Sequence, residues 1–382
     1  MSNRGRYRGG VLPDATRRAA PNWRARDDWA APTVPELRRI DGPRPIQRLG
    51  ESSAPTPAAI RAPAPVRPRE RVPGGIALDG LDQQDVDESA QFSWHDLVWR
   101  IKRMDFGPGR GANYELDLRE RIRTSVGTAF PIAVLNLKGG VGKTSVVEAL
   151  GSTLASVRRD PVIGIDLDGG DLSDRHGRRS HLNMLDLLQD ITVTRYSDVR
   201  AHTYMNSSGF EVLGLPDYVN TNWRVERQDF IKVFSILRKH YSLVLIDCVK
   251  ALNSTVMEAV LPESRALVVV SSASIDSIKK TKTTLEWLRR NGYAKLIAST
   301  VLAVNHTEPR ELDTLAGKEL EQLAAQVAAT VVLPFDRHIH EGREIGIDRL
   351  SKESRRCYLE LAAAVAERFP GRDVRRNDYR SW

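Results

Sequence analysis

The sequence has little cysteine and no long apolar run. Cys248 and Cys357 stand far apart without the spacing of metal ligands, so neither a disulfide framework nor a cysteine-bound metal is expected. The longest apolar runs, such as PIAVL and ALVVV, fall well short of the roughly 20 residues that a spanning helix needs. No apolar stretch follows the first arginines, which argues against a signal peptide. These absences predict a cytoplasmic protein without a transmembrane segment.

Lysine is missing from the first 71 residues, where 15 arginines face 7 acidic residues. That excess accounts for the whole net charge of +8, and the remaining chain is neutral. Because the remaining chain is neutral, we do not expect its folded part to bind DNA, but the arginines of the first 71 residues leave DNA binding as an alternative. Residues 1–90 are also rich in proline and alanine, so they bury too little apolar surface to offset the entropy of ordering. We expect a disordered arm, either a solvated linker or a docking segment for an acidic partner.

The rest of the chain divides into a helical lead-in at 91–125, a domain at 126–370 and a polar tail at 371–382. In the domain, short apolar runs alternate with amphipathic helical stretches, a pattern typical of a parallel sheet covered on both faces. We therefore predict an α/β, doubly wound, mainly parallel sheet of about seven strands. The last helix, 351–369, has a face of small apolar residues that suits packing on the sheet better than binding a membrane. The predicted strands are PIAVLNL, PVIGID, FEVLGLP, SLVLID, ALVVVSS, LIASTVLAVN and TVVLP, and the other predicted helices are 143–157, 224–239, 274–291 and 311–328.

The stretch LNLKGGVGKTS, residues 135–145, joins the first strand to the first helix of this domain. Glycines let backbone N–H groups surround a phosphate, and the helix N-terminus adds its positive dipole. In such a phosphate loop Lys143 neutralises the β- and γ-phosphates and Thr144 offers its hydroxyl to Mg²⁺. The predicted nucleotide contacts are Lys138, Gly139, Gly140, Val141, Gly142, Lys143, Thr144 and Ser145.

The loop departs from the usual pattern, because Leu137 stands where a glycine is common and Lys138 opens the loop. In both respects it resembles the deviant Walker A motif of the ParA/MinD ATPases. The resemblance implies that Lys138 reaches across an ATP-dependent dimer to the nucleotide of the other subunit. A second cation on developing phosphate charge suits phosphoryl transfer, and supplying it in trans would tie hydrolysis to dimerisation.

Further segments resemble motifs of the same family. IDLDGGD resembles its first switch, which implies that Asp166 holds a Mg²⁺-bound water and Asp168 orients the attacking water. Gly169 and Asp171 replace the proline and asparagine usual there. Asp247 ends a buried strand like a Walker B aspartate, at the edge where open α/β sheets form their sites. The proline that usually follows this aspartate is replaced by the run Cys248-Val249-Lys250.

Two later segments are similar to those that hold the base in this family. Asn305 ends a strand at a position that implies contact with the adenine edge. Pro334 and Asp336 lie in VVLPFDRHIHEG, which resembles the segment closing around the base. His338 and His340 in this segment have no third ligand nearby in sequence, so we expect no metal there.

The phrases YELDLRERIR, SDVRAHT, EWLRRNGY and PFDRHIHEG resemble the MinD-like ATPases of mycobacterial type VII (ESX) secretion, the EspI-like group. This resemblance covers roughly residues 93–369 and includes a proline-rich N-terminal region. It implies an ATPase with ATP and Mg²⁺ as cofactors that forms a homodimer and regulates a secretion machine. The arm would contact that machine, which would bring the protein to the inner membrane.

Three alternatives stay open on the sequence. The altered switches favour a nucleotide-binding scaffold that does not hydrolyse ATP, and the arginine-rich arm leaves room for a partitioning ATPase on DNA. A metabolic relative of the same fold, such as an amide-forming ligase or an iron–sulfur reductase, is the third. The reductase would need clustered cysteines, which this chain lacks.

Overall fold

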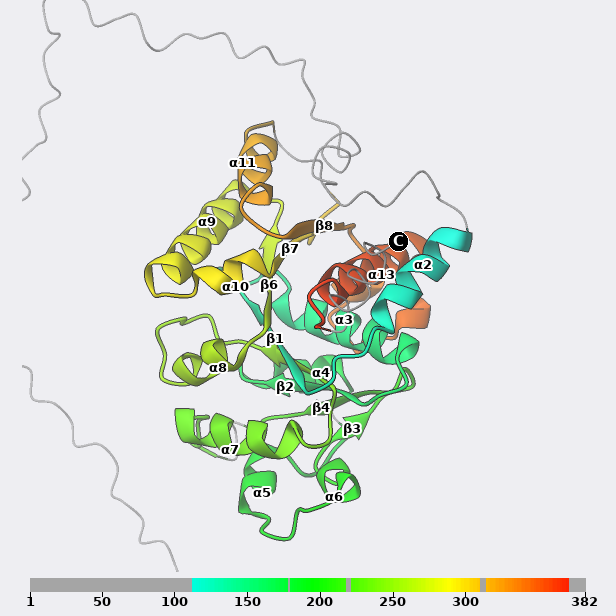
Figure 1. Ribbon diagram of the computed structural model, residues 1–382, viewed down its shortest axis with the longest axis vertical. Coiled ribbons are helices and arrows are strands. Elements are labelled where there is room, and N and C mark those ends of the chain that lie inside the picture. The colour runs from blue at the N-terminus through cyan, green and yellow to red at the C-terminus, as the bar shows by residue number, and fades with distance from the viewer. Residues whose placement is uncertain (1–111, 178, 218–220, 310–313, 371–382) are drawn as a thin grey trace, which may run out of the picture. The chain divides into compact units, whose positions relative to one another are not determined.

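One parallel sheet organises the part of the chain that the structure describes. A computed structural model describes residues 112–177, 179–217, 221–309 and 314–370 (Figure 1). The arm expected at 1–90, most of the lead-in and the tail at 371–382 lie outside these residues. The described strands are β1 (Phe130–Leu135), β2 (Val162–Asp166), β3 (Tyr204–Met205), β4 (Phe210–Leu213), β5 (Leu243–Asp247), β6 (Ala266–Ser272), β7 (Thr300–Asn305) and β8 (Ala329–Leu333).

The described strands lie in the order β3-β4-β2-β5-β1-β6-β7-β8. All neighbouring pairs are parallel except β3 and β4. The helices of at least five residues are α2 (Ala112–Ile122), α3 (Lys143–Val157), α4 (Asp171–Arg175), α5 (Met184–Gln189), α6 (Tyr196–Arg200), α7 (Arg227–Leu237), α8 (Met257–Glu263), α9 (Ile275–Arg290), α10 (Ala294–Ala298), α11 (Thr314–Ala324) and α13 (Lys352–Ala366). Two shorter turns, α12 (Arg337–His340) and a 3₁₀ turn at Ile347–Arg349, precede α13.

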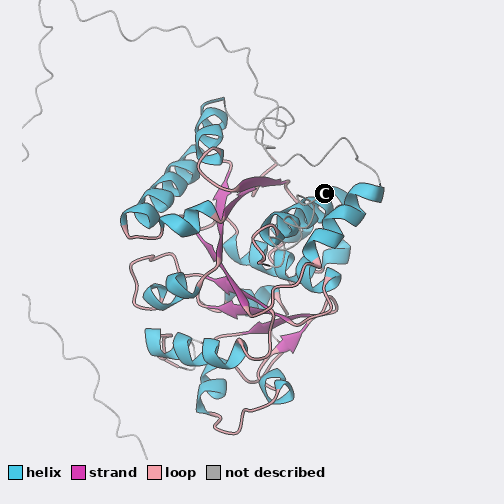
Figure 2. Cartoon of the chain, viewed as in Figure 1, coloured by secondary structure: helices cyan, strands magenta, loops and turns pink. Residues whose placement is uncertain are grey.

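Helices cover both faces of the sheet, because strand side chains alternate between two apolar clusters (Figure 2). In β1, Ile132 and Val134 enter one cluster, whereas Ala133 and Leu135 enter the other. The first cluster is completed by α2, α3 and α13, and the second by α5 and α7–α11. Such double coverage is the arrangement that the near-continuous apolar strands predict.

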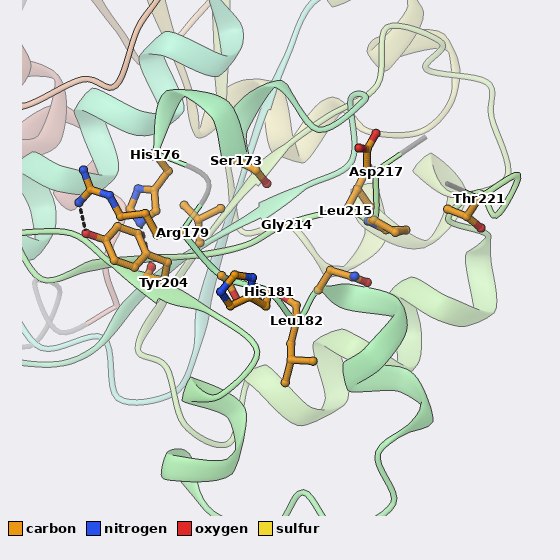
Figure 3. Close-up of a pocket in the computed structure, with 14 residues that line it drawn as sticks. Ser173, His176, Arg179, His181, Leu182, Tyr204, Gly214, Leu215, Asp217 and Thr221 are labelled. Carbon is orange, nitrogen blue, oxygen red and sulfur yellow. Dashed lines mark hydrogen bonds between the residues drawn. The ribbon is translucent and has the colours of Figure 1, made fainter. Parts of the chain in front are cut away.

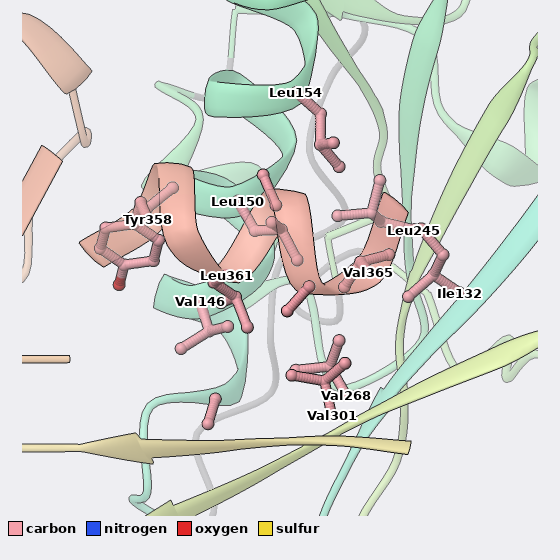
Figure 4. Close-up of a cluster of buried hydrophobic side chains, with 14 of the residues drawn as sticks. Ile132, Val146, Leu150, Leu154, Leu245, Val268, Val301, Tyr358, Leu361 and Val365 are labelled. Atoms are coloured by element: carbon pink, nitrogen blue, oxygen red, sulfur yellow. The ribbon is translucent and has the colours of Figure 1, made fainter. Parts of the chain in front are cut away.

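The C-terminal helix α13 is part of the core. Tyr358, Leu361 and Val365 pack among Leu150 of α3 and strand residues such as Val268 (Figure 4). The small face predicted for sheet packing is buried as expected, at Leu359, Ala362, Ala363 and Ala366. Among the described residues, no helix has the length and apolar character to cross a membrane.

The predicted architecture is confirmed, with local differences. Each of the seven apolar runs contains a strand, and the extra strand β3 is a two-residue edge piece. The run that begins at Leu296 was expected to be strand throughout, but its first residues form α10 and β7 begins only at Thr300. A helical turn here lets Ile297 enter the core, and short apolar runs do not distinguish the two states by periodicity.

The strand order determines where a site can form. β1, β5 and β2 are neighbours in space although they are distant in sequence, so the segments that follow them meet at one edge. Asp166 and Asp247 are register partners on β2 and β5, and Val134 pairs with Asp247 from the other side. Sites in open α/β sheets form at this carboxyl edge.

Gly151 lets α3 approach β4 closely, because a β-carbon there would overlap the ring of Phe210. Gly151→Ala should therefore lower the free energy of unfolding by about 1–3 kcal/mol, although alanine is the better helix former. Urea denaturation measures this change. In a Phe210→Leu background the same substitution should cost clearly less, and an equal cost in both backgrounds would contradict the steric explanation.

Candidate functional site

A buried side chain and two glycines of the phosphate loop fix its backbone conformation. Val141 is 1% exposed and inserts into the core, which anchors the middle of the loop. Gly140 (φ 76°) and Gly142 (φ 88°) adopt left-handed backbone that other residues rarely adopt. Helix α3 then begins at Lys143, so its free N–H groups face the loop.

Asn305 lies at the end of β7 and supports this loop. Its side-chain amide donates to the Val141 carbonyl at 2.9 Å, and a β-carbon on Gly142 would collide with the same amide. The side chain is almost fully buried. The structure thus places Asn305 against the loop backbone, which is a positional role that the sequence did not suggest.

Two of the predicted carboxylates lie at the start of α3. Lys143 Nζ forms an ion pair with Asp168 Oδ2 at 2.8 Å, and Lys143 is only 4% exposed at its side chain. The Thr144 hydroxyl donates to Asp247 Oδ2 at 2.6 Å. The predicted lysine, threonine and aspartates are therefore brought together from three separate segments of the chain.

Asp166 organises the loop that carries Asp168. Its two carboxylate oxygens accept hydrogen bonds from the backbone N–H groups of Asp168, Gly170, Leu172 and Ser173. Gly169 (φ 93°) and Gly170 (φ 88°) both adopt left-handed backbone. Proline cannot adopt that conformation, since its ring holds φ near −65°. The glycine at 169 is thus suited to this path of the loop.

The hydrogen bonding of the segment after β5 explains why the proline usual after Asp247 is absent. The backbone N–H of Cys248 donates to the Val134 carbonyl at 3.1 Å and extends the pairing of β5 with β1. A proline at 248 would remove this donor. The thiol of Cys248 is fully buried, and burial raises its pKa, so the cysteine is a core residue rather than a nucleophile.

The electrostatics of the aspartates fit a divalent cation. Burial raises the pKa of Asp166 to about 6, and burial together with the nearby Asp166 raises the pKa of Asp247 to about 8. Asp247 Oδ1 is buried and has no hydrogen-bond partner among the described residues. A bound cation would lower these pKa values and would give Asp247 Oδ1 a partner. Mg²⁺ commonly takes one or two carboxylates plus phosphate oxygens and water, so Thr144 and Asp247 suit it.

The described protein side chains do not form a complete metal-binding site by themselves. Among the described residues, no group of three or more His, Cys, Asp and Glu side chains is arranged to hold a metal. Asp166 is already occupied by backbone N–H groups on both oxygens. Its position fits contact through a water better than direct ligation.

Lys138 points away from this group of residues. Its ammonium pairs with Asp276 near the start of α9 at 2.5 Å, and both side chains are substantially exposed. The lysine backbone is held by Asn136, whose Oδ1 accepts from the Lys138 N–H at 2.9 Å. The Asn136 amide also donates to Thr281 and the Val270 carbonyl, so it ties the loop to α9 and β6.

The segment expected to close around the base serves to join helices. Asp336 caps α12 through the His338 N–H at 2.9 Å and also accepts from the Ser351 N–H at 2.9 Å, next to α13. Pro334 is partly buried directly after β8. The Nε2 atom of His338 accepts from the Gly346 N–H, whereas His340 is exposed. None of these bonds reaches the phosphate loop.

A buried ion pair connects α3 to the switch helix α4. His176, at the end of α4, contacts both oxygens of Glu148 on α3 at 2.9 and 3.1 Å. Its other ring nitrogen lies 2.8 Å from the Tyr204 carbonyl. Burial alone lowers the pKa of His176, but the charge and hydrogen bond of Glu148 outweigh it and raise the pKa above 6.5.

A pocket of about 450 Å³ lies beside α4 and the end of β4 (Figure 3). His176, Arg179 and Tyr204 form one wall, with Arg179 hydrogen-bonded to the Tyr204 hydroxyl. None of its lining residues comes from the phosphate loop. The pocket is therefore separate from the lysine and aspartate cluster described above.

Sequence reasoning missed Asn136, Glu148 and His176. Asn136 left a signal, because it is a polar residue directly after the apolar run of β1. Glu148 and His176 left none, since each looks like an ordinary helix-surface residue until α3 and α4 are placed together.

The His176–Glu148 pair should make stability depend on pH. The folded pKa of His176 is raised, so the contribution of the pair is complete below about pH 6.5 and is lost as pH rises through the folded pKa. The double variant His176→Gln/Glu148→Gln removes both charges. The stability advantage of the wild type over this variant should shrink as pH rises above about 6.5, by at most about 1.4 kcal/mol per pH unit.

Urea denaturation at several pH values measures this difference. The exposed His340→Gln variant serves as the control and should follow the wild-type profile. An advantage that stays constant or grows with pH would show that the pair does not titrate as described.

The sequence of the chain is similar to those of known proteins. A family model described as "AAA domain" matches residues 130–295. The chain is 37% identical over 284 residues to the ESX-1 secretion-associated protein EspI of Mycobacterium tuberculosis, a match that covers 73% of this chain and 43% of EspI. The chain thus spans less than half of the length of this relative.

Solved structures share the fold. A ParA family ATPase from Chlorobium tepidum superposes with a TM-score of 0.52 at 15% identity, over 62% of this chain and 98% of that one. The cell division ATPase MinD of Pyrococcus furiosus gives a TM-score of 0.49 at 19% identity, over 63% and 99% of the two chains. The chain is thus similar to the AAA domain family over residues 130–295, shares the fold of the ParA family ATPase and is a relative of EspI.

Proposed function

We propose that this protein is a Mg²⁺-dependent ATPase that dimerises on ATP and regulates a partner machine. The observation that carries the proposal is the meeting of Lys143 and Thr144 with Asp168 and Asp247 at the start of α3. The lysine supplies positive charge, the threonine and Asp247 supply metal ligands, and Asp168 supplies a carboxylate for water. The similarity to the domain family supports this reading.

In the proposed reaction the chain binds and orients ATP. The N–H groups of residues 139–144 hold the phosphates, and Lys143 exchanges its contact with Asp168 for the β- and γ-phosphates. The freed Asp168 then orients a water whose oxygen bonds to the γ-phosphorus as the bond to the β–γ bridging oxygen breaks. ADP leaves with that oxygen, and the water's protons remain on phosphate or pass to solvent. Mg²⁺, held by Thr144 and Asp247, would neutralise charge on the phosphates.

Dimerisation is proposed because Lys138 has no role within the subunit's own site. Its side chain is partly exposed and makes an ion pair that is accessible to solvent, which costs little to exchange for a phosphate. Asp276 therefore holds Lys138 at the surface until a second subunit presents its nucleotide. This arrangement fits a cation donated in trans.

The partner is proposed from the relationship to EspI, a protein whose name associates it with ESX-1 secretion. We propose that the chain acts in the cytoplasm on a type VII secretion machine and contacts it through residues 1–90. The resemblance alone supports this step, since the match covers less than half of EspI.

A nucleotide-binding scaffold is the second candidate. The direct ion pair between Lys143 and Asp168 favours it, because Asp168 must leave its partner before it can orient water. A scaffold would bind ATP and dimerise without turnover. Phosphate release separates the two candidates.

Replacing Lys143 with alanine should abolish measurable ATP binding and turnover, because it removes a charge that contacts the phosphates directly. Calorimetry with ATP and phosphate release measure the two effects, with the exposed Lys239→Ala variant as a matched control. ATP should bind more tightly than GTP if Asn305, Pro334 and Asp336 form the base site. Equal affinity for the two would overturn the base site, and unchanged ATP binding by Lys143→Ala would overturn the phosphate loop.

Lys138→Ala and Asp168→Ala should affect the dimer in opposite ways. Without Lys138, each monomer should keep most of its nucleotide affinity but lose the ATP-bound dimer and its hydrolysis. Without Asp168, ATP should persist and the dimer should accumulate. Light scattering with ATP and Mg²⁺ reports both. Two variants that stay monomeric at every concentration would mean that Lys138 is a surface lysine without a role in trans.

A further inference from the structure

Lys250 lies against the phosphate loop although no motif assigns it a role. It follows Asp247 by three residues, and its side chain covers Gly139, the second residue of the loop. A β-carbon on Gly139 would lie 3.1 Å from Lys250 Cε and 3.4 Å from Nζ. Gly139 is not among the glycines with positive φ. The Lys250 side chain therefore packs closely over Gly139.

The segment that carries Lys250 is anchored on both sides. Cys248 is fully buried and its N–H is bonded to Val134, while Leu252 is 2% exposed in the core. Lys250 itself is exposed at the surface of this short segment. Its backbone is therefore positioned over the loop, and only the side chain is free to move.

Lys250 differs from the other two lysines at the loop in having no acidic partner. Lys143 pairs with Asp168 and Lys138 with Asp276. Lys250 makes no hydrogen bond or ion pair within the part of the chain that the structure describes. An ammonium without a counterion beside the loop creates a positive position. Such a position suits a multiply charged anion.

We propose that Lys250 binds the γ-phosphate of the nucleotide held by its own subunit. This inference rests on the proposed function and adds a contact that distinguishes ATP from ADP. Lys250 comes from the segment that follows Asp247, whose carboxylate is bonded to Thr144 on the metal side of the site. The loop N–H groups of such sites hold the α- and β-phosphates, and a metal held by Thr144 and Asp247 would neutralise charge toward the terminal phosphate. A cation reaching over the loop from the metal side therefore meets the terminal phosphate.

The test compares affinities for a non-hydrolysable ATP analogue and for ADP, both with Mg²⁺. Lys250→Gln removes the charge and shortens the polar side chain by one atom, so it should weaken binding of the analogue roughly tenfold and leave ADP binding almost unchanged. Lys250→Arg should restore most of the discrimination. The control variant Lys239→Gln replaces an exposed lysine that lies outside the phosphate loop. Its affinities for both nucleotides should match those of the wild type.

The outcomes separate this proposal from the one on which it rests. If the wild type discriminates between the two nucleotides and Lys250→Gln discriminates equally well, Lys250 has no γ-phosphate contact and this proposal fails alone. Tighter binding by Lys250→Gln would show that the lysine blocks the loop, which also overturns it. A wild type that binds neither nucleotide would overturn both proposals. Thermal unfolding of Lys250→Gln checks that any loss of affinity does not come from misfolding.

Discussion

The whole site depends on one constraint, the adjacency of β2, β5 and β1 in the sheet. It sets Asp166 opposite Asp247 in register and places both beside the loop that follows β1. Two buried carboxylates so close together repel each other, and burial raises the pKa of both. The fold accepts this cost at the point where Lys143 and the start of α3 supply positive charge and Thr144 supplies a hydroxyl donor. A buried polar cluster of this kind is typical of a functional site rather than of a stability element.

The contacts around the loop give it a defined shape before any ligand is considered. Val141 anchors it in the core, Asn305 holds its backbone, and Asn136 ties its start to α9. Preorganised N–H groups do not have to be ordered when a phosphate binds, which favours affinity. In the proposed reaction the side chains of Lys143, Lys138 and Lys250 would move while the loop backbone stays in place.

The departures from the family pattern become understandable in the folded chain. Gly169 replaces a proline at a position whose backbone only glycine adopts easily, and Cys248 replaces one where a backbone donor is used. The same segment places the Lys250 side chain over Gly139. These differences lie around one site.

The sequence alone determined the fold class, the phosphate loop and the strand-end aspartates. Apolar runs at strand length and a glycine loop before a helix are local signals, so one sequence suffices to recognise them. Only the tertiary structure decided the partners: Lys143 with Asp168, Lys138 with Asp276, Asn305 with the loop, and His176 with Glu148. Each of these contacts joins residues far apart in the chain, and the strand order that brings them together is not written in any local pattern. The boundary between α10 and β7 was missed for a related reason, since the burial of Ile297 depends on the helices packed around it.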